Sequence, residues 1–127
     1  MRTLVYGAFV AAIVLCLSSN ASADGVAESW SCKLVEGKSI SDVQAVNSKW
    51  LAWINSHVKG GGIKSSVGTA VVGDTESFIF VDSYPGLSAW AAAKEALSSD
   101  EGRAVEAQFN DVANCSQNRL WRIQDTM

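Results

Sequence analysis

Residues 77–83 restrict the possible folds of this chain more than any other segment, because both sides of the segment are apolar. Successive side chains of a β-strand point to opposite faces, so Phe78 and Phe80 share one face. Ile79 and Val81 share the other. A sheet with one face in water carries polar residues at alternate positions, and this segment does not. We therefore expect a sheet with both faces covered.

Turn and capping residues divide the remaining chain into strands and helices. The alternating segments predict strands at 28–35, 63–73, 77–83 and 119–123. The helical periodicity predicts helices at 41–58, 88–97 and 98–113, and a polar loop is expected at 114–118. Capping-box patterns begin at Ser41 and Ser98, and Gly60-Gly61-Gly62 ends the first helix.

The order β-α-β-β-α-β, with the second helix broken in two, predicts a ferredoxin-like α+β fold. Such a fold has one four-stranded antiparallel sheet, and its helices cover one face. In the predicted strand 63–73 the alternation adds Val71 to one face and Val72 to the other. The simplest cover for the second apolar face is another copy of the chain, so we expect a symmetric homodimer.

Residues 1–23 have the pattern of a secretory signal peptide. Arg2 is followed by an uncharged apolar stretch, Leu4 to Leu17, and by the small-residue sequence Ala21-Ser22-Ala23. The apolar stretch is too short to cross a bilayer, which takes about 20 residues. We expect cleavage after Ala23, a single domain at 24–127 without a membrane anchor, and a secreted or periplasmic protein.

The three cysteines predict one disulfide. Cleavage would remove Cys16 and leave Cys32 and Cys115, which pair in an oxidising compartment. Closing so long a loop stabilises by about 4 to 5 kcal/mol on the chain-entropy estimate, and often by less. The pair lacks the C-x-x-C spacing of redox sites. With the single histidine it offers too few ligands for zinc, so we expect no metal site.

The charge of the chain argues against some classes of partner. With 10 basic and 13 acidic side chains and a pI near 5.0, the sequence has no basic stripe that could neutralise phosphate groups. We therefore expect that the protein binds neither nucleic acid nor an anionic membrane surface.

Three segments resemble a known superfamily. The stretch from Asp82 to Trp90, the break at 98–102 and the aromatic residue Phe109 are similar to the dimeric α/β-barrel superfamily, especially small antibiotic-biosynthesis-monooxygenase-type domains. The resemblance implies a ferredoxin-like fold, a barrel formed by the sheets of two protomers, and a small-molecule pocket between each sheet and its helices. The superfamily includes cofactor-independent monooxygenases, haem-linked enzymes and lactone isomerases, so the resemblance selects no single chemistry.

Two polar residues of the first predicted helix are candidates for catalysis. His57 falls in the apolar sector of the helix, and Asn47 lies at its border. An imidazole there could ligate haem or accept a proton, and an amide could orient a carbonyl or oxygen species. The alternative is structural: His57 interacts with the helix C-terminus, and Asn47 is a partly exposed amide.

Aromatic residues are candidates for a pocket wall. Five residues are expected to line a sheet–helix pocket for a flat ligand: Trp50, Ile54, Phe78, Phe80 and Trp90. The tryptophans, including Trp30, Trp53 and Trp121, could instead fill the core and the dimer interface. Arg119 and Arg122 could bind an acidic group or remain solvated at a strand edge.

Three functions remain open from the sequence. The first is an exported homodimer that binds a small hydrophobic or aromatic molecule without evident catalysis. The second is a cofactor-independent or haem-linked monooxygenase that uses a pocket near His57. The third is a non-catalytic protein-interaction module, which would bury its aromatic residues in contacts with one another.

Overall fold

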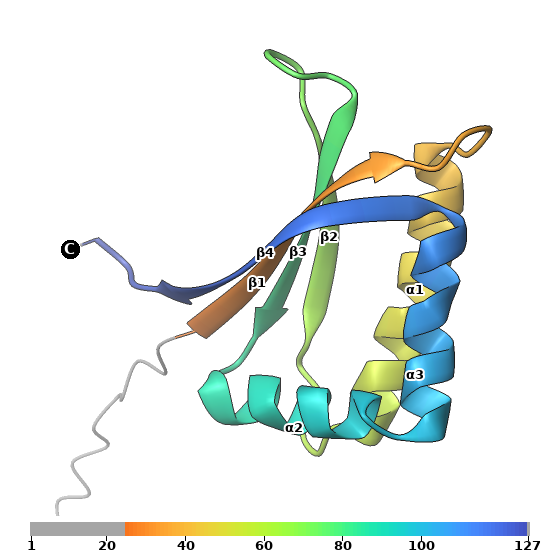
Figure 1. Cartoon of the computed structure of the whole chain (residues 1–127). Coiled ribbons are helices and arrows are strands. Elements are labelled where there is room, and N and C mark those ends of the chain that lie inside the picture. The colour runs from red at the N-terminus through yellow and green to blue at the C-terminus, as the bar shows by residue number, and fades with distance from the viewer. Residues whose placement is uncertain (1–24, 127) are drawn as a thin grey trace, which may run out of the picture.

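The computed structural model describes residues 25–126, in which a twisted sheet is covered on one face by helices (Figure 1). The signal peptide predicted at residues 1–23 lies outside the described residues. The strands are β1 (Gly25–Leu34), β2 (Lys64–Thr69), β3 (Ser77–Tyr84) and β4 (Ala113–Ile123). The helices are α1 (Ile40–His57), α2 (Leu87–Leu97) and α3 (Asp100–Ala107), and a 3₁₀ turn follows at Gln108–Asp111.

The sheet has the strand order β2-β3-β1-β4, and every neighbouring pair is antiparallel. The central strand β1 pairs with β3 on one side and with β4 on the other. Each β-α-β unit therefore places its helix on the same face, and α1 and α3 lie side by side there (Figure 1). This arrangement confirms the predicted ferredoxin-like α+β fold and the broken second helix.

The strand register decides which side chains face the helices. On β3 the buried positions are Phe78, Phe80, Asp82 and Tyr84, which alternate with more exposed residues. Their partners on β1 are Cys32, Trp30, Glu28 and Val26, in that order. Two carboxylates, Glu28 and Asp82, therefore lie directly opposite each other on the inward face of the sheet.

The apolar core between sheet and helices has two parts. One includes Trp50, Ile54 and Leu97, at the end of the sheet that α2 covers. The other includes Val43, Phe78 and Phe80, near the disulfide. Burying a side chain of this size contributes about 1.5 to 3 kcal/mol, so these clusters supply much of the stability of the fold.

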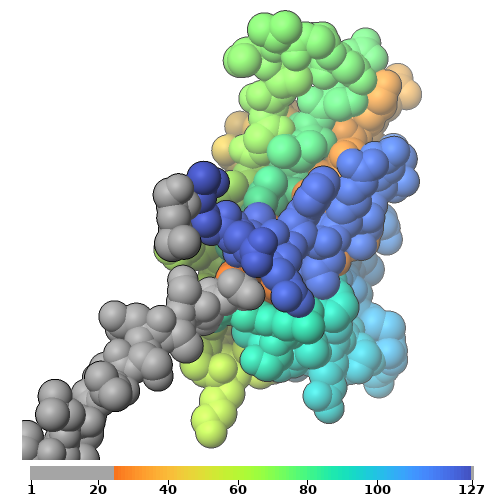
Figure 2. All heavy atoms as spheres, turned by 90° about the vertical axis from the view of Figure 1, so that its left-hand side faces the viewer, coloured from red at the N-terminus to blue at the C-terminus, as the bar shows by residue number. Residues whose placement is uncertain are grey.

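The opposite face of the sheet is uncovered in the single chain (Figure 2). Ile79 is 41% exposed and Trp121 is 46% exposed, and both project from this face according to the strand register. The outward position of Ile79 confirms the prediction that β3 is apolar on both sides. On β1, in contrast, Ser29 and Ser31 point outward, so the open face is a mixture of apolar and polar side chains.

Several predicted boundaries were wrong. The cap of α1 is Ser39 rather than Ser41: the Ser39 backbone N–H donates to Asp42 Oδ2 at 2.8 Å, and Ser39 Oγ accepts from the Asp42 N–H at 3.3 Å. Strand β2 ends at Thr69, because the hairpin opens there; Val71 is 92% exposed and Val72 is 88% exposed. The apolar residues at this tip made the predicted strand too long.

The last strand was predicted too short. Residues 114–118 form part of β4 and are not a polar loop, because backbone pairing with β1 extends to Ala113. A register shift at Ser31/Cys32 allows the pairing to continue past the disulfide. The preceding helix ends at Ala107, six residues before the predicted end, and the 3₁₀ turn links it to β4.

The predicted disulfide joins Cys32 of β1 to Cys115 of β4, 83 positions later in the chain. It therefore links the first strand to the last across the whole of the intervening fold. Within residues 25–126, no helix combines the length and the apolar character needed to cross a bilayer.

Candidate functional site

A cavity of about 520 Å³ lies between the inward face of the sheet and the helices. Its wall comes from β1, β3 and β4 on one side and from α1, α2, α3 and the 3₁₀ turn on the other. The lining residues are Trp30, Asn47, Trp50, Phe80, Asp82, Lys94, Arg103, Glu106, Ala107, Phe109, Asn110, Ala113 and Cys115. The volume is within the usual range for small-molecule sites, roughly 300 to 1,000 Å³.

Four aromatic side chains form much of the cavity wall. Phe109 meets Phe80 edge to face, with ring centroids 5.2 Å apart, and meets Trp50 at 6.5 Å. Trp30 lies across the sheet from Phe80. The four residues belong to β1, β3, α1 and the 3₁₀ turn, so packing of four separate elements holds their rings in place. Flat, rigid walls of this kind suit a flat apolar ligand.

Asp82 is the most unusual group in this wall. It is only 7% exposed, and its single hydrogen bond within residues 25–126 is made by Oδ1, which accepts from Ser65 Oγ at 2.5 Å. No fully buried side-chain polar atom in this part of the chain is without a partner, so Oδ2, which accepts no hydrogen bond, keeps some exposure. Asp82 lines the cavity. Burial, with a smaller contribution from the charge of Glu28, raises the pKa of Asp82 to about 6.

Asn47 reaches the same carboxylate through Ser65. Asn47 Nδ2 donates to Ser65 Oγ at 2.8 Å, and the Ser65 hydroxyl donates to Asp82. Asn47 is buried and lines the cavity. The chain Asn47–Ser65–Asp82 thus joins α1, β2 and β3 in a fixed polar arrangement at the edge of an apolar space.

Glu28 organises a second polar network beside the cavity. It is 3% exposed, and Lys94 Nζ of α2 lies 2.7 Å from its Oε2. Trp90 Nε1 donates to the same oxygen at 3.2 Å, and Asn118 Nδ2 donates to Oε1 at 2.8 Å. The Tyr84 hydroxyl lies 3.5 Å from Oε2. One buried carboxylate therefore ties together two strands and a helix around β1.

Neighbouring carboxylates affect two other groups. Burial raises the pKa of Tyr84 far above its usual value, and the charges of Asp82 and Glu28 add to the effect. Partial burial is the main cause that raises the pKa of Glu106. The positive charge of Lys94 opposes this rise, and the negative charge of Glu28 adds to it. Burial is thus the main cause of each shift, and the cavity is lined by two acidic and two basic side chains.

The structure brings together only some of the residues predicted for the site. Trp50, Phe80 and Asn47 line the cavity. Ile54 and Phe78 are buried in the core and are absent from the cavity wall. Trp90 is half-buried and contacts the site indirectly, through its hydrogen bond to Glu28.

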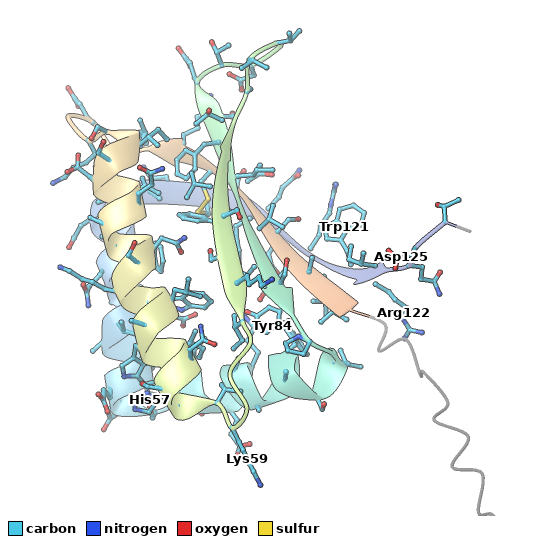
Figure 3. The ribbon with its side chains drawn as sticks, turned by 180° about the vertical axis from the view of Figure 1, so that it is seen from behind. His57, Lys59, Tyr84, Trp121, Arg122 and Asp125 are labelled. Carbon is cyan, nitrogen blue, oxygen red and sulfur yellow. A yellow bond between two sulfur atoms is a disulfide. The ribbon has the colours of Figure 1, made fainter. Side chains whose placement is uncertain are left out.

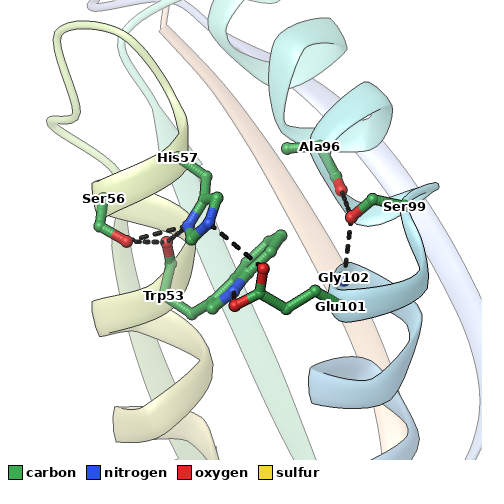
Figure 4. Close-up of polar contacts among 7 residues, drawn as sticks. All are labelled: Trp53, Ser56, His57, Ala96, Ser99, Glu101 and Gly102. Atoms are coloured by element: carbon green, nitrogen blue, oxygen red, sulfur yellow. Dashed lines mark hydrogen bonds and ion pairs between the residues drawn. The ribbon is translucent and has the colours of Figure 1, made fainter.

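His57 does not point inward, so its predicted position in the apolar sector was wrong. Its side chain is 39% exposed and stacks on Trp53 with ring centroids 3.9 Å apart (Figure 4). Nδ1 lies 2.8 Å from the Trp53 carbonyl oxygen, and Nε2 lies 3.8 Å from Glu101 Oε2. His57 therefore lies on the outer surface at the last turn of α1. Its contact with a backbone carbonyl oxygen near the helix C-terminus agrees with the structural role considered for it.

The cavity offers poor ligands for haem iron. His57, the only histidine of the chain, does not line the cavity, so no imidazole can reach a group bound there. Within residues 25–126, no three His, Cys, Asp or Glu side chains are placed to hold a metal ion together. The residues present do not fit a haem-linked site near His57.

The arginines of β4 also lie away from the cavity wall. Arg119 stacks over Trp121 at 5.9 Å, and both are exposed. Trp121 projects from the side of the sheet that faces away from the helices (Figure 3), and its Nε1 donates to Ser29 Oγ at 2.8 Å. Arg122 is exposed near the end of the strand. Neither arginine binds an acidic group within the site.

The sequence analysis missed Glu28, Asp82, Ser65 and Lys94. A signal for two of them was available in the strand periodicity. Asp82 has the same parity as Phe80, and Glu28 the same parity as Trp30, so both carboxylates occupy positions that an inward-facing apolar residue would fill. Buried charged residues of this kind mark candidate sites.

No known family model matches the chain, and no curated protein does. Solved structures do match its fold. SnoaB, a cofactor-independent oxygenase from Streptomyces nogalater, has a TM-score of 0.60 at 11% identity, over 83% of this chain and 98% of SnoaB. A NIPSNAP family protein from Agrobacterium tumefaciens has a TM-score of 0.59 at 17% identity, with coverage of 83% and 90%.

An uncharacterized NIPSNAP-like domain protein from Burkholderia xenovorans is also similar. Its TM-score is 0.56 at 12% identity, over 82% of this chain and 89% of that protein. Likeness at such low identity establishes architecture and not chemistry. The chain has a ferredoxin-like α+β fold, which it shares with SnoaB and with the NIPSNAP proteins.

Proposed function

We propose that this protein binds a small, flat, largely apolar molecule in the cavity between sheet and helices. The observation that carries the proposal is an aromatic-walled space of about 520 Å³ lined by Asp82, whose Oδ2 has no hydrogen-bond partner within residues 25–126. Apolar walls with a few polar groups are typical of small-molecule sites. An interaction module without a pocket is less well supported, because Trp30 and Trp50 border open space.

The proposal includes export and a homodimer. The disulfide supports the proposal that the chain reaches an oxidising compartment. A secretory signal at residues 1–23 would deliver it there. Ile79, Trp121 and Ile123 leave apolar surface on or beside the open sheet face, and a second copy would cover it. Light scattering that finds a monomer at tens of micromolar would contradict the dimer.

A variant whose new side chain fills the cavity tests the binding proposal. Ala107 lines the cavity, and Ala91 is exposed on α2 outside it. Isothermal titration with indole, a flat neutral probe, should show binding to the wild type and at least about a tenfold loss in Ala107→Trp, since the new ring occupies the space. Ala91→Trp should bind like the wild type. Equal affinity in both variants would place the ligand elsewhere.

A second candidate function is a cofactor-independent oxygenase. Asp82, with a pKa raised to about 6, is suited to accept a proton from an acidic hydroxyl near neutral pH. Asn47, close by in the wall, could orient the resulting anion or dioxygen. The fold shared with SnoaB, itself a cofactor-independent oxygenase, is consistent with this reading.

Oxygen consumption with 1,4-dihydroxynaphthalene tests this second function. If the protein is an oxygenase, the wild type should consume oxygen faster than the uncatalysed oxidation does. Asp82→Asn should then lower kcat by about a hundredfold, because general-base catalysis contributes roughly 10²–10⁴-fold. The melting temperature of the variant should not fall. A rate equal to the protein-free control leaves the cavity as a binding site only.

A further inference from the structure

The basic residues of the cavity already have acidic partners. Lys94 Nζ lies 2.7 Å from Glu28 Oε2, and this carboxylate is buried behind the wall. The Arg103 guanidinium contacts Asp100 and the Ser98 carbonyl oxygen at the start of α3. Lys94 and Arg103 are therefore each paired with a carboxylate that does not line the cavity.

The acidic residues of the cavity have no such partners. Asp82 and Glu106 line the wall, and within residues 25–126 neither lies within 4.0 Å of a basic group. Asp82 is 7% exposed, and its only side-chain hydrogen bond leaves Oδ2 without a partner. A buried carboxylate without a cation is costly, and a positively charged ligand would remove much of that cost.

The aromatic rings beside these carboxylates favour the same kind of ligand. Trp30, Trp50 and Phe80 line the cavity together with Asp82. The face of an aromatic ring attracts a cation, most strongly when the ring is that of tryptophan. Lys94 already makes such a contact, with Nζ 6.0 Å from the centre of the Trp30 ring. Aromatic faces and free carboxylates together form a site for an ammonium group attached to a flat apolar body.

We propose that the cavity selects a protonated amine, with its ammonium donating to Asp82 Oδ2 and its apolar ring system lying against Trp50 and Phe80. Glu106, an exposed residue of the cavity lining, adds a second negative charge to the site. This inference rests on the proposed function, because it names the class of molecule that the same cavity binds. A bare metal ion is less suited, since no three metal-ligating side chains converge within residues 25–126.

Three probes with one ring system test the inference. Tryptamine carries an ammonium, tryptophol a neutral hydroxyl, and indole-3-propionate a carboxylate. Isothermal titration of the wild-type protein at pH 7.5 should give tryptamine at least about tenfold tighter than tryptophol, because a hydrogen bond to a charged group is among the strongest single contacts. Indole-3-propionate should bind most weakly, owing to repulsion by Asp82 and Glu106.

Charge-removing variants locate the selectivity. Asp82→Asn should reduce the preference for tryptamine over tryptophol to less than about threefold while changing tryptophol affinity little. Glu106→Gln should reduce the preference by a smaller factor, since Glu106 is more exposed and solvent screens it. Glu95→Gln, an exposed change on α2 outside the cavity, should keep the wild-type preference.

The possible outcomes separate the two proposals. Equal binding of tryptamine and tryptophol, or tightest binding of indole-3-propionate, overturns the amine selectivity and leaves a general aromatic site standing. A preference for tryptamine that survives in Asp82→Asn also overturns it, because the ammonium then lies elsewhere. No binding of any probe at millimolar concentration overturns both proposals.

Discussion

Replacing Glu28 by Gln should destabilise the fold strongly, although the side chain keeps its size. The carboxylate is 3% exposed, forms an ion pair with Lys94 at 2.7 Å and accepts hydrogen bonds from Trp90 and Asn118. A glutamine has one acceptor oxygen instead of two, and its amide leaves either the ammonium or another donor without a partner. The variant therefore loses a charge pair and at least one hydrogen bond together.

The magnitude follows from the burial of the two partners. Breaking a fully buried ion pair costs about 3 to 5 kcal/mol. The Lys94 side chain remains 33% exposed and can be partly solvated, so we expect about 2 to 3 kcal/mol for Glu28→Gln. In a domain of this size the melting temperature should fall by roughly 8 to 20 °C.

Urea unfolding monitored by tryptophan fluorescence measures this loss directly. Glu95→Gln, on the exposed side of α2, is the matched control and should stay within about 0.5 kcal/mol of the wild type. The double variant Glu28→Gln with Lys94→Met should lose less than the sum of its single changes, because no unpaired ammonium remains. A Glu28→Gln protein within about 0.5 kcal/mol of the wild type would refute the role given to this carboxylate.

The remaining predictions concern three other features. The pKa of Asp82 is about 6 in the folded protein against an ordinary 3.8, so the folded state is favoured while this carboxyl is protonated. This stability is fully present below about pH 4 and is lost as the pH rises through 6. Asp82→Asn should therefore exceed the wild type by about 1 to 3 kcal/mol in urea unfolding at pH 8, and a gap that persists at pH 4 would contradict this. Replacing Cys32 and Cys115 by Ser should cost about 2 to 5 kcal/mol, and dithiothreitol should lower the wild-type melting temperature but not that of the variant. At Gly102 a Cβ would lie 2.5 Å from backbone atoms in the last turn of α2, so Gly102→Ala should cost about 2 kcal/mol or more. Gly86→Ala, where a Cβ meets nothing within 4 Å, should be nearly neutral by calorimetry.

The fold was predictable because its signals are local and repeated. The alternation around Phe78 and Phe80 predicted an inward and an outward face for β3, and both exist. The break before Asp100 separated α2 from α3 correctly, although the cap of α3 is Ser99 and not the predicted Ser98. The start of β4 was not predictable in the same way. The polar residues at 114–118 have no strand pattern, and they extend only because β1 offers them backbone partners.

The site was less predictable, because it depends on which side chains tertiary packing leaves without a partner. His57 satisfied a helical-wheel criterion, yet the wheel does not show where the apolar face ends, and the side chain lies on the surface. Asp82 stood inside the segment that carried the family resemblance, but its neighbours along the sequence gave no hint of Ser65 or Asn47. Only the sheet register and the packing of α1 bring these three together.

The five tryptophan indole N–H groups report directly on the central claim that the cavity binds a flat ligand. Trp30 and Trp50 line the cavity, whereas Trp53 binds Glu101 on the outer surface and Trp121 binds Ser29 on the far side of the sheet. In a ¹H–¹⁵N spectrum of the protein titrated with tryptamine, the Trp30 and Trp50 signals should shift and those of Trp53 and Trp121 should not. Shifts at Trp53 or Trp121 alone, or no shift at saturating probe, would contradict the account.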